Sequence, residues 1–468
     1  MADYTVQHVH VAFAGAGSGT GELTWGQRAA WRVFAADGEA KTLGGVVPAP
    51  STATVERVAD GLRFVVGRHQ ALRTRLRFQP DGDVRQEVAT SGEVPLEVVD
   101  AADGADPAAV ADQVRRRLQT EPFDYERDWP VRMAVVRHGG TLTHTVAVYL
   151  QTALDALGLT ALTLDLQAYR SGAPVQPVTA IQPLELAAKQ LERAALRQSE
   201  ASLRQMESVL RAAPMHRWPE PVDPGPPVWD TLCFRSPALA QAVAAVARRR
   251  GMDTSPILLG AYALGLAEVT GVNPVAVMLA VSNRFRPRMA TSVSPLAQVA
   301  GCLLDVAGAT LDEVVGRAWQ AAMSAYKHAY YDPVERFEVA RRLGATRGGP
   351  RDLSCYFNDR RTQGLRAVTA AGAGAAGDPA DLVAEQRRTE LRWHLQPGFP
   401  QEIAYLNVDQ VPGAIELALT VNTRVLARPL VERLLRRLED AAVGMALHPD
   451  TPTGVPAGAA QRPRAGAR

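Results

Sequence analysis

The amino-acid sequence predicts a mixed α/β protein that folds as two lobes. Its 468 residues exceed the usual size of a single hydrophobic core, so at least two lobes of roughly 150 to 250 residues are expected. Hydrophobic patterns typical of strands and of helices alternate along the chain. Residues 214–229 contain six prolines, which interrupt helical structure, and a loosely similar order of strands and helices follows this segment.

The first half of the chain opens with a strand. Residues 5–13 alternate, with Val9, Val11 and Phe13 on the face opposite His8 and His10. Two histidines on a strand could hold a metal ion, but no third ligand lies nearby in the sequence, so we expect a solvated strand face and no metal. The other elements predicted in this half are a strand over 142–150 and helices over 23–34, 54–67, 159–169 and 183–211.

The second half repeats this order loosely. It is predicted to contain strands over 231–234, 275–281 and 390–395, and helices over 238–250 and 256–267. The resulting division of the chain is an N-terminal lobe over 1–180, a connecting helix and proline-rich linker over 181–228, a C-terminal lobe over 229–450 and a disordered tail over 451–468.

Composition excludes several classes of partner. The formal net charge of +2 gives no long-range field for nucleic acid. The N-terminus lacks the pattern of a secretory signal, and the longest nearly apolar run, 256–267, is too short to cross a bilayer. Cys233, Cys302 and Cys355 have no metal-ligand spacing and are expected to be reduced thiols. We therefore expect a cytoplasmic protein that binds neither nucleic acid nor membrane.

Several segments resemble the condensation domain of nonribosomal peptide synthesis, in the same order and over nearly the whole chain, from about residue 5 to 445. LTWGQRAAW (23–31) is similar to the family's first helix motif, and RHQALRTRL (68–76), which begins with Arg68 and His69, is similar to its second motif. VMLAVSNRFRP is similar to a strand and arginine turn of the family's second lobe, and VAGCLLDV is similar to the glycine-led strand that follows. YKHAYYDPVERF is similar to the helix after that strand.

This resemblance implies two lobes of the chloramphenicol-acetyltransferase type, arranged as a V-shaped pseudo-dimer with a central tunnel. In the family a donor carrier protein approaches one mouth of the tunnel and an acceptor the other. The expected partners are thus a carrier protein or a peptide substrate, and also a tailoring enzyme. No cofactor of its own is expected, although the substrate can be tethered to a phosphopantetheine arm.

The family's diagnostic motif, His-His-x-x-x-Asp-Gly, aligns with LQTALDA. Leu150 and Gln151 stand in place of the two histidines, Asp155 is retained, and Ala156 replaces the glycine. The strand before the motif and the helix after it keep their register. We therefore interpret the loss of both histidines as real.

Gln151 would occupy the position of the histidine that, in the family, contacts the attacking amine. A carboxamide can accept a hydrogen bond from an amine or donate one to an oxyanion, but it takes up no proton near neutral pH. Loss of a general base typically costs about 10² to 10⁴ in rate. Proximity of two bound reactants can still supply about 7 to 11 kcal/mol at best, so transfer is handicapped and not forbidden.

The retained aspartate indicates a preserved fold. By the resemblance, Asp155 pairs with an arginine of the second-lobe turn, which by position is Arg284. A buried carboxylate needs such a partner, because an unpaired one would cost several kcal/mol.

Further residues are candidates through tertiary contact only. Asp305 and His394 are candidate catalytic groups beside Gln151, with the alternative readings of a strand-end acid and a structural histidine. Tyr149, Asp359 and Arg360 are candidates for the tunnel lining, with mutual pairing as the alternative for the last two. His144 is excluded, because seven residues of strand place it about 23 Å from Gln151.

Two functions remain open. The first is an enzyme of peptide natural-product biosynthesis that transfers or rearranges an acyl or aminoacyl group without the usual histidine. The second is a non-catalytic module that recruits a carrier protein or a tailoring enzyme. A reaction on a free or ribosomally made peptide is a further possibility that the sequence leaves open.

Overall fold

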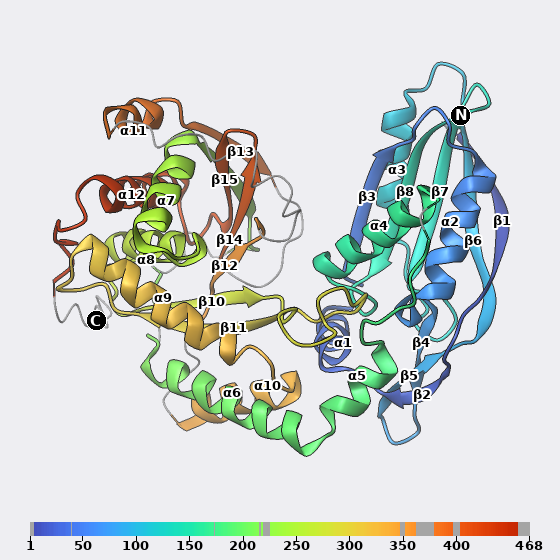
Figure 1. Cartoon of the computed structure of the whole chain (residues 1–468), viewed down its shortest axis with the longest axis horizontal. Coiled ribbons are helices and arrows are strands. Elements are labelled where there is room, and N and C mark those ends of the chain that lie inside the picture. The colour runs from blue at the N-terminus through green and yellow to red at the C-terminus, as the bar shows by residue number, and fades with distance from the viewer. Residues whose placement is uncertain are drawn as a thin grey trace. The chain divides into compact units, whose positions relative to one another are not determined.

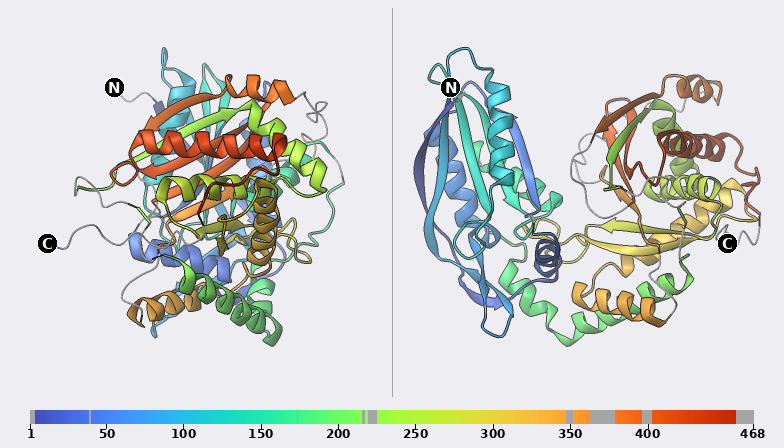
Figure 2. Two further views of the ribbon diagram at one scale, coloured as in Figure 1. Left: turned by 90° about the vertical axis from the view of Figure 1, so that its left-hand side faces the viewer. Right: turned by 180° about the vertical axis from the view of Figure 1, so that it is seen from behind.

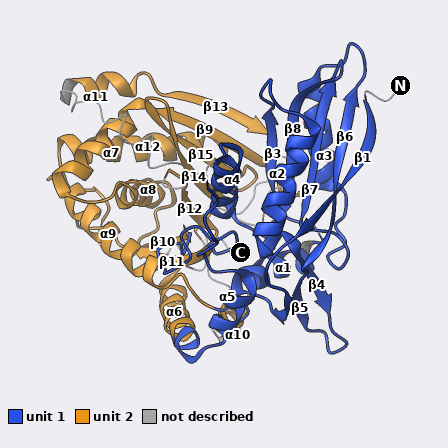
Figure 3. Cartoon of the chain, turned by 45° about the vertical axis from the view of Figure 1, so that its right-hand side comes forward, with its two compact units in different colours: residues 1–197, 282–297, 332–334 blue, residues 198–281, 298–331, 335–468 orange. Residues whose placement is uncertain are grey.

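The structure is a computed structural model that describes residues 4–38, 40–172, 174–214, 217–218, 225–346, 352–361, 379–395 and 403–456. The chain divides into two compact units (Figure 3). Unit 1 contains residues 1–197, 282–297 and 332–334, and unit 2 contains residues 198–281, 298–331 and 335–468. Two short segments from the second half of the sequence therefore belong to the N-terminal unit.

Unit 1 is built on a five-stranded sheet in the order β1-β6-β7-β8-β3 (Figure 1). All neighbouring strands are antiparallel except β6 and β7, which are parallel. Helices α2 and α4 pack against one face of the sheet, and α3 packs against the other. The strands are β1 (Tyr4–Ala14), β3 (Thr42–Pro48), β6 (Ser91–Ala101), β7 (Val131–His138) and β8 (Thr141–Leu150), and the helices are α2 (Val55–Arg68), α3 (Pro107–Thr120) and α4 (Ala156–Arg170).

A second, three-stranded sheet of unit 1 has the order β2-β5-β4. Helix α1 begins after Thr24, whose side chain accepts from the backbone of Gln27 in a reciprocal capping box, which satisfies two otherwise free backbone donors. The elements of this part are β2 (Gly19–Glu22), α1 (Trp25–Asp37), the short 3₁₀ helix Gln70–Arg73, β4 (Thr74–Phe78), β5 (Val84–Val88) and α5 (Pro183–Gln190).

Unit 2 is built on a seven-stranded sheet in the order β11-β10-β12-β14-β15-β9-β13. Helices α7, α8, α9 and α12 lie on one face and bury the largest core of the protein (Figures 1 and 2). The strands are β9 (Trp229–Ser236), β10 (Val275–Val281), β11 (Gln298–Leu304), β12 (Cys355–Asp359), β13 (Glu390–Leu395), β14 (Ala404–Val411) and β15 (Ala414–Asn422), and the helices are α6 (Arg193–Ala212), α7 (Pro237–Arg250), α8 (Ser255–Thr270), α9 (Leu311–Lys327), α10 (Pro333–Thr346), α11 (Pro379–Gln386) and α12 (Arg428–Leu447). The first residues of α6, 193–197, and of α10, 333–334, belong to unit 1.

Most predicted elements are confirmed within a few residues. The apolar run 256–267 is a helix whose side chains are buried throughout, and the strand predicted over 275–281 has those bounds. His8 and His10 are exposed on β1, and no metal-binding cluster of histidine, cysteine, aspartate or glutamate occurs among the described residues. The three cysteines are free thiols, of which Cys302 and Cys355 are buried.

Four predictions need correction. The helix predicted over 183–211 is two helices, α5 and α6, with a break at Leu191 and Glu192. Neither residue of the break is a proline or a glycine, so the sequence contains no residue that would predict it. It follows Gln190, whose buried carboxamide accepts from the backbone of Trp25 and so holds the end of α5.

The boundary between the units lies after residue 197, not after 180 or in the proline-rich segment, because α5 packs with β2 of unit 1. The segment YKHAYYDPVERF is not one helix, since α9 ends at Lys327 and α10 begins at Pro333. Of the predicted disordered tail, residues 451–456 are ordered on unit 2, where Thr453 is buried and donates to Val306. The rest of the tail, 457–468, lies outside the described residues.

No helix among the described residues has both the length and the apolar character needed to span a membrane.

Candidate functional site

The degenerate motif begins at the last residue of β8. The side chain of Leu150 is buried and packs in an apolar cluster with Leu23, Leu76, Phe123 and Tyr125. This position therefore carries no polar group.

Gln151 follows in a turn, and its backbone N–H donates to the carbonyl of Lys41 at 2.9 Å. This bond extends the pairing of β8 with β3 by one residue. The next three residues, Thr152, Ala153 and Leu154, are buried, whereas Gln151 is partly exposed. Between positions 150 and 154, Gln151 is thus the single side chain that solvent reaches.

A cavity of about 10 Å³ lies beside Leu150 and Thr152. Gln27, Thr74 and Asp128 contribute polar side chains to its wall. A volume of this size holds about one water molecule and cannot admit a substrate. The cavity therefore belongs to the packing behind the motif.

Asp155 caps the N-terminus of α4 and uses both carboxylate oxygens for structure. Oδ1 accepts from the backbone N–H of Gly158 at 2.7 Å and is paired with Nη2 of Arg284. Oδ2 accepts from the backbone N–H groups of Leu296 and Ala297 at 2.8 and 2.9 Å. With four donors around it, this carboxylate is committed to holding the start of α4.

Arg284 completes the same network. Its Nη1 donates to the carbonyls of Met289 and Ser292, at 3.1 and 2.7 Å, and its Nη2 also donates to Ser294 at 3.1 Å. The guanidinium therefore organises the loop 282–297 and ties it to α4. The ion pair expected between Asp155 and Arg284 is present, and both partners lie in unit 1. Ala156, at the position of the motif glycine, is exposed at the first turn of α4.

Arg68 and His69 contact α4 further along the helix, at Asp165. Nε of Arg68 donates to Asp165 at 2.8 Å, and Nε2 of His69 lies 3.1 Å from the same carboxylate oxygen. Burial lowers the pKa of His69, which is 1% exposed. The adjacent His69 side chain, followed by Arg68, lowers the pKa of Asp165. These contacts fix the turn after α2 and support a structural role for both motif residues.

Tyr149 points into the main core of unit 1 and is buried. Burial raises the pKa of its phenol to about 12, so the hydroxyl stays protonated at neutral pH. The side chain is a packing element in this unit.

Asp305 lies at the end of β11 and is exposed. Its Oδ1 accepts from the side chain of Asn273 at 2.6 Å and from the backbone N–H of Ala307 at 3.0 Å. The hydrogen bond from Asn273 is the main reason that the pKa of this carboxyl is lowered. Asp305 thus has the contacts of a strand-end acid.

Asp359 and Arg360 occupy the end of β12. Asp359 pairs with Arg361 at 2.5 Å, and both side chains are largely but not fully buried. Arg360 pairs with Asp409 on β14, with Nε donating at 2.9 Å. Both groups are therefore engaged in ion pairs within unit 2.

His394 is exposed on β13, where it is paired with Thr231 of β9. Strands β13 and β11 are the two opposite edges of the seven-stranded sheet. At about 4.8 Å between neighbouring strands, six spacings separate them by about 29 Å. His394 and Asp305 therefore do not gather at one site, contrary to the expectation that both act beside Gln151.

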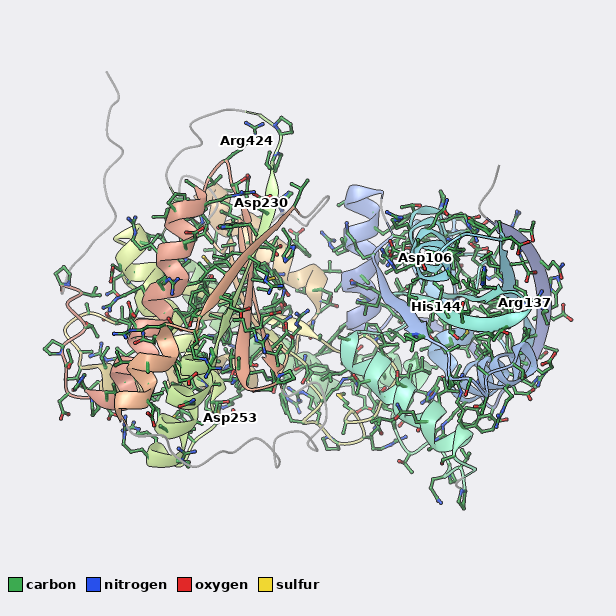
Figure 4. The ribbon with its side chains drawn as sticks, turned by 90° about the horizontal axis from the view of Figure 1, so that it is seen from above. Asp106, Arg137, His144, Asp230, Asp253 and Arg424 are labelled. Atoms are coloured by element: carbon green, nitrogen blue, oxygen red, sulfur yellow. The ribbon has the colours of Figure 1, made fainter. Side chains whose placement is uncertain are left out.

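Two further histidines, His144 and His328, have local partners. His144 lies on β8 opposite Val136 of β7 (Figure 4). It contacts Thr143 at 3.1 Å. His328 ends α9 and contacts the carbonyl of Ser324 at 2.8 Å. Neither is at the end of β8.

Several contributors to the site had no signal in the sequence. The backbone donors of Leu296 and Ala297 lie 141 and 142 residues from Asp155, and backbone groups leave no residue-type signature. Arg73 had a partial signal, because it belongs to the second motif. It is fully buried and its guanidinium donates to the carbonyls of Ala16, Gly17 and Ala89.

Several solved structures have a fold similar to that of this protein. A condensation domain from the monacolin K polyketide synthase MokA is 18% identical with a TM-score of 0.72, covering 93% of this chain and 99% of that one. The X-domain from teicoplanin biosynthesis is 18% identical with a TM-score of 0.68, covering 92% and 96%. SgcC5 from Streptomyces globisporus is 20% identical with a TM-score of 0.65, covering 92% and 100%. No curated protein sequence matches the chain.

The two units and the strand–turn–helix motif with its Asp–Arg pair define a protein of the chloramphenicol-acetyltransferase-like fold. The family model of the condensation domain matches residues 42–335, which is more than half of the chain. The protein therefore belongs to the condensation-domain family, and its resemblance to that family in sequence is confirmed.

Proposed function

We propose that the protein catalyses acyl or aminoacyl transfer in the biosynthesis of a peptide natural product, with Gln151 positioning the nucleophile. The observation that carries this proposal is the accessibility of Gln151 between buried neighbours, at the position where the family presents its catalytic histidine. A carboxamide in that place can orient an amine or hydroxyl by hydrogen bonding. The acceleration then comes from proximity of the two reactants.

The tethered acyl group of a carrier protein is the proposed donor. Family membership supports a donor carried on a phosphopantetheine arm, and one structural neighbour is described by its role in condensation-domain-mediated chain release from the enacyloxin polyketide synthase. The leaving group is then the carrier thiol, and the nucleophile loses its proton to water or buffer because Gln151 cannot accept it.

The test is intact-protein mass spectrometry of product formation. Aminoacyl groups on a phosphopantetheinylated carrier protein are the donors, and an amino-acid amide is the acceptor. We expect Gln151→Ala to lower the rate by about 5- to 30-fold, since a lost hydrogen bond to a reacting group costs about 1 to 2 kcal/mol. Gln167→Ala, an exposed glutamine of α4, is the matched control and should leave the rate unchanged.

The pH profile separates positioning from base catalysis. The wild-type rate should follow ionisation of the amine alone, with no inflection near pH 6.5. Gln151→His should introduce such an inflection, because imidazole titrates in that range. Equal rates for wild type, Gln151→Ala and Gln151→His would show that Gln151 has no part in transfer.

A second function, recruitment without catalysis, is favoured by the burial of Leu150 and by the complete structural use of Asp155. The teicoplanin X-domain, a structural neighbour, is also known in complex with OxyB. Under this reading the protein would bind a carrier protein or a tailoring enzyme. Carrier binding by calorimetry that is retained in Gln151→Ala, together with no product from the wild type, would establish it.

A further inference from the structure

A groove of about 700 Å³ lies on unit 1, between α2, the end of β1 and residues 178–182. This volume falls in the range of small-molecule sites, which is about 300 to 1,000 Å³. The groove contains none of the motif residues at the end of β8. It is therefore a separate feature of this unit.

One strip of α2 forms the long wall. Arg63, Phe64, Gly67 and Arg68 line the groove. Residues four apart on a helix are neighbours, so these side chains form two adjacent rows along α2. Gly67 allows the close approach of β1, since a Cβ at this position would lie 2.5 Å from the carbonyl oxygen of Ala14. The sequence thus brings the helix against the strand end and leaves the arginines at the rim.

The floor of the groove is apolar and fixed. The ring of Phe64 stacks on Tyr169 of α4 with centroids 4.1 Å apart and an interplanar angle of 8°. Ala16 and Val178 add small apolar surface to the wall. The guanidinium carbon of Arg68 lies 5.7 Å from the centroid of the same ring, so an apolar or aromatic group in the groove would meet the ring beside this guanidinium.

The two guanidiniums at the rim are held in place by other groups. Arg63 donates through Nε to Ala12 at 3.1 Å and through Nη1 to Asp60, and Arg68 donates through Nε to Asp165 and through Nη1 to Gln176, both at 2.8 Å. Within the described residues, these bonds leave Nη2 of each arginine without a hydrogen-bond partner. Two oriented donors therefore remain beside an apolar floor.

The local charge balance favours a ligand with one negative charge. Asp60 and Asp165 offset Arg63 and Arg68. Arg170 approaches the same helix, with Nη2 3.5 Å from the position of a Cβ at Gly61, and has no ion pair with another described residue. The excess is thus one positive charge, which suits a carboxylate better than a doubly charged phosphate.

We propose that this groove binds a small carboxylate that carries an apolar or aromatic body. The carboxylate accepts from the free Nη2 groups of Arg63 and Arg68, and the body packs on Phe64 and Val178. Charge-assisted hydrogen bonds to guanidinium groups give affinity for the carboxylate, and the stacked floor selects the apolar body. This site is independent of transfer at Gln151 and would serve a ligand other than the tethered acyl group.

Isothermal titration calorimetry of the full-length protein with phenylacetate tests the proposal. We expect saturable binding at millimolar concentration or below, and about tenfold weaker binding by Arg63→Gln, the loss expected for one charged hydrogen bond. Arg63 is half-exposed, so its substitution should leave the fold intact. Arg57→Gln, an exposed arginine in the first turn of α2 that does not line the groove, is the matched control and should bind within twofold of wild type.

Neutral phenylacetamide and inorganic phosphate serve as comparison ligands for the wild-type protein. This comparison holds even if a variant fails to fold. Weaker binding of both than of phenylacetate supports the proposal, as does unchanged phenylacetate affinity in Gln151→Ala. Equal affinity for the amide, tighter binding of phosphate, or no loss in Arg63→Gln would overturn it.

Discussion

At the residue scale, the degenerate motif keeps the aspartate that has a structural role and replaces the two histidines. Asp155 retains four hydrogen-bond donors around its carboxylate, whereas Leu150 joins an apolar cluster and Gln151 cannot titrate. The selective retention of Asp155 has a physical reason. Loss of Asp155 would leave the buried guanidinium of Arg284 without its ion-pair partner. Loss of a base at the exposed position 151 changes the reaction rate but not the stability of the fold.

Asp155→Asn tests the structural role. The amide can still cap α4, but it carries no charge to balance Arg284, whose side chain is 6% exposed. We expect a loss of about 3 to 5 kcal/mol in the free energy of unfolding, the cost typical of breaking one partner of a buried pair. Urea denaturation followed by circular dichroism measures it.

Glu200→Gln supplies the control for this substitution. Glu200 pairs with Arg204 on the surface of α6, with both side chains about two-thirds exposed. Exposed pairs contribute little, so the change should stay below about 0.5 kcal/mol. A similar small change in Asp155→Asn would contradict a structural role for the pair.

At the element scale, α4 is held at its first turn and at its middle by different chemistry. Asp155 and Arg284 fix its first turn, and Asp165 joins its middle to Arg68 and His69 at the end of α2. The sequence predicted the helix, and it predicted the arginine partner through the family resemblance. The contact between Asp165 and His69 was not predicted, because helical spacing does not say which neighbouring helix a polar residue meets.

His69 should make stability depend on pH. Burial lowers its pKa in the folded state, so below pH 6.5 the unfolded chain binds a proton that the folded protein resists. The contribution of His69 to the free energy of unfolding is complete above the pKa of the unfolded state. It is lost as the pH falls from that value through the pKa of the folded state. The loss can reach at most about 1.4 kcal/mol per pH unit.

The measurement is the urea midpoint of wild type and His69→Gln at about pH 7.5 and about pH 5. Wild type should lose more stability between the two pH values than the variant, which has no imidazole to charge. The lowered pKa of Asp165 puts its titration at lower pH, outside this window. Parallel pH dependence of both proteins would show that His69 is not held neutral by the fold.

At the scale of the whole molecule, each unit has its own hydrophobic core. Leu96 is fully buried in the core of unit 1, and Leu434 is fully buried in the core of unit 2. The chain nevertheless enters unit 1 three times, through residues 1–197, 282–297 and 332–334. Each unit thus has a core of its own, although neither unit is continuous in the sequence.

Leu96→Ala and Leu434→Ala should each cost about 2 to 5 kcal/mol, through lost burial and the cavity left behind. Hydrogen exchange detected by mass spectrometry should show faster exchange chiefly in the unit that carries the substitution. Segment 282–297 should follow unit 1, with Leu96→Ala. If it followed Leu434→Ala instead, the assignment of this segment to unit 1 would be incorrect.

The sequence by itself determined those helices and strands that have a clear local pattern, and it showed that the motif lacks both histidines. Local patterns were sufficient for β1, α2, α8 and β10, because periodicity and caps act within a few residues. Only the tertiary structure decided the break between α5 and α6, the membership of residues 282–297 in unit 1, and the separation of Asp305 from His394. Each depends on contacts between residues distant in the chain, such as Gln190 with Trp25, and such contacts have no periodicity to reveal them.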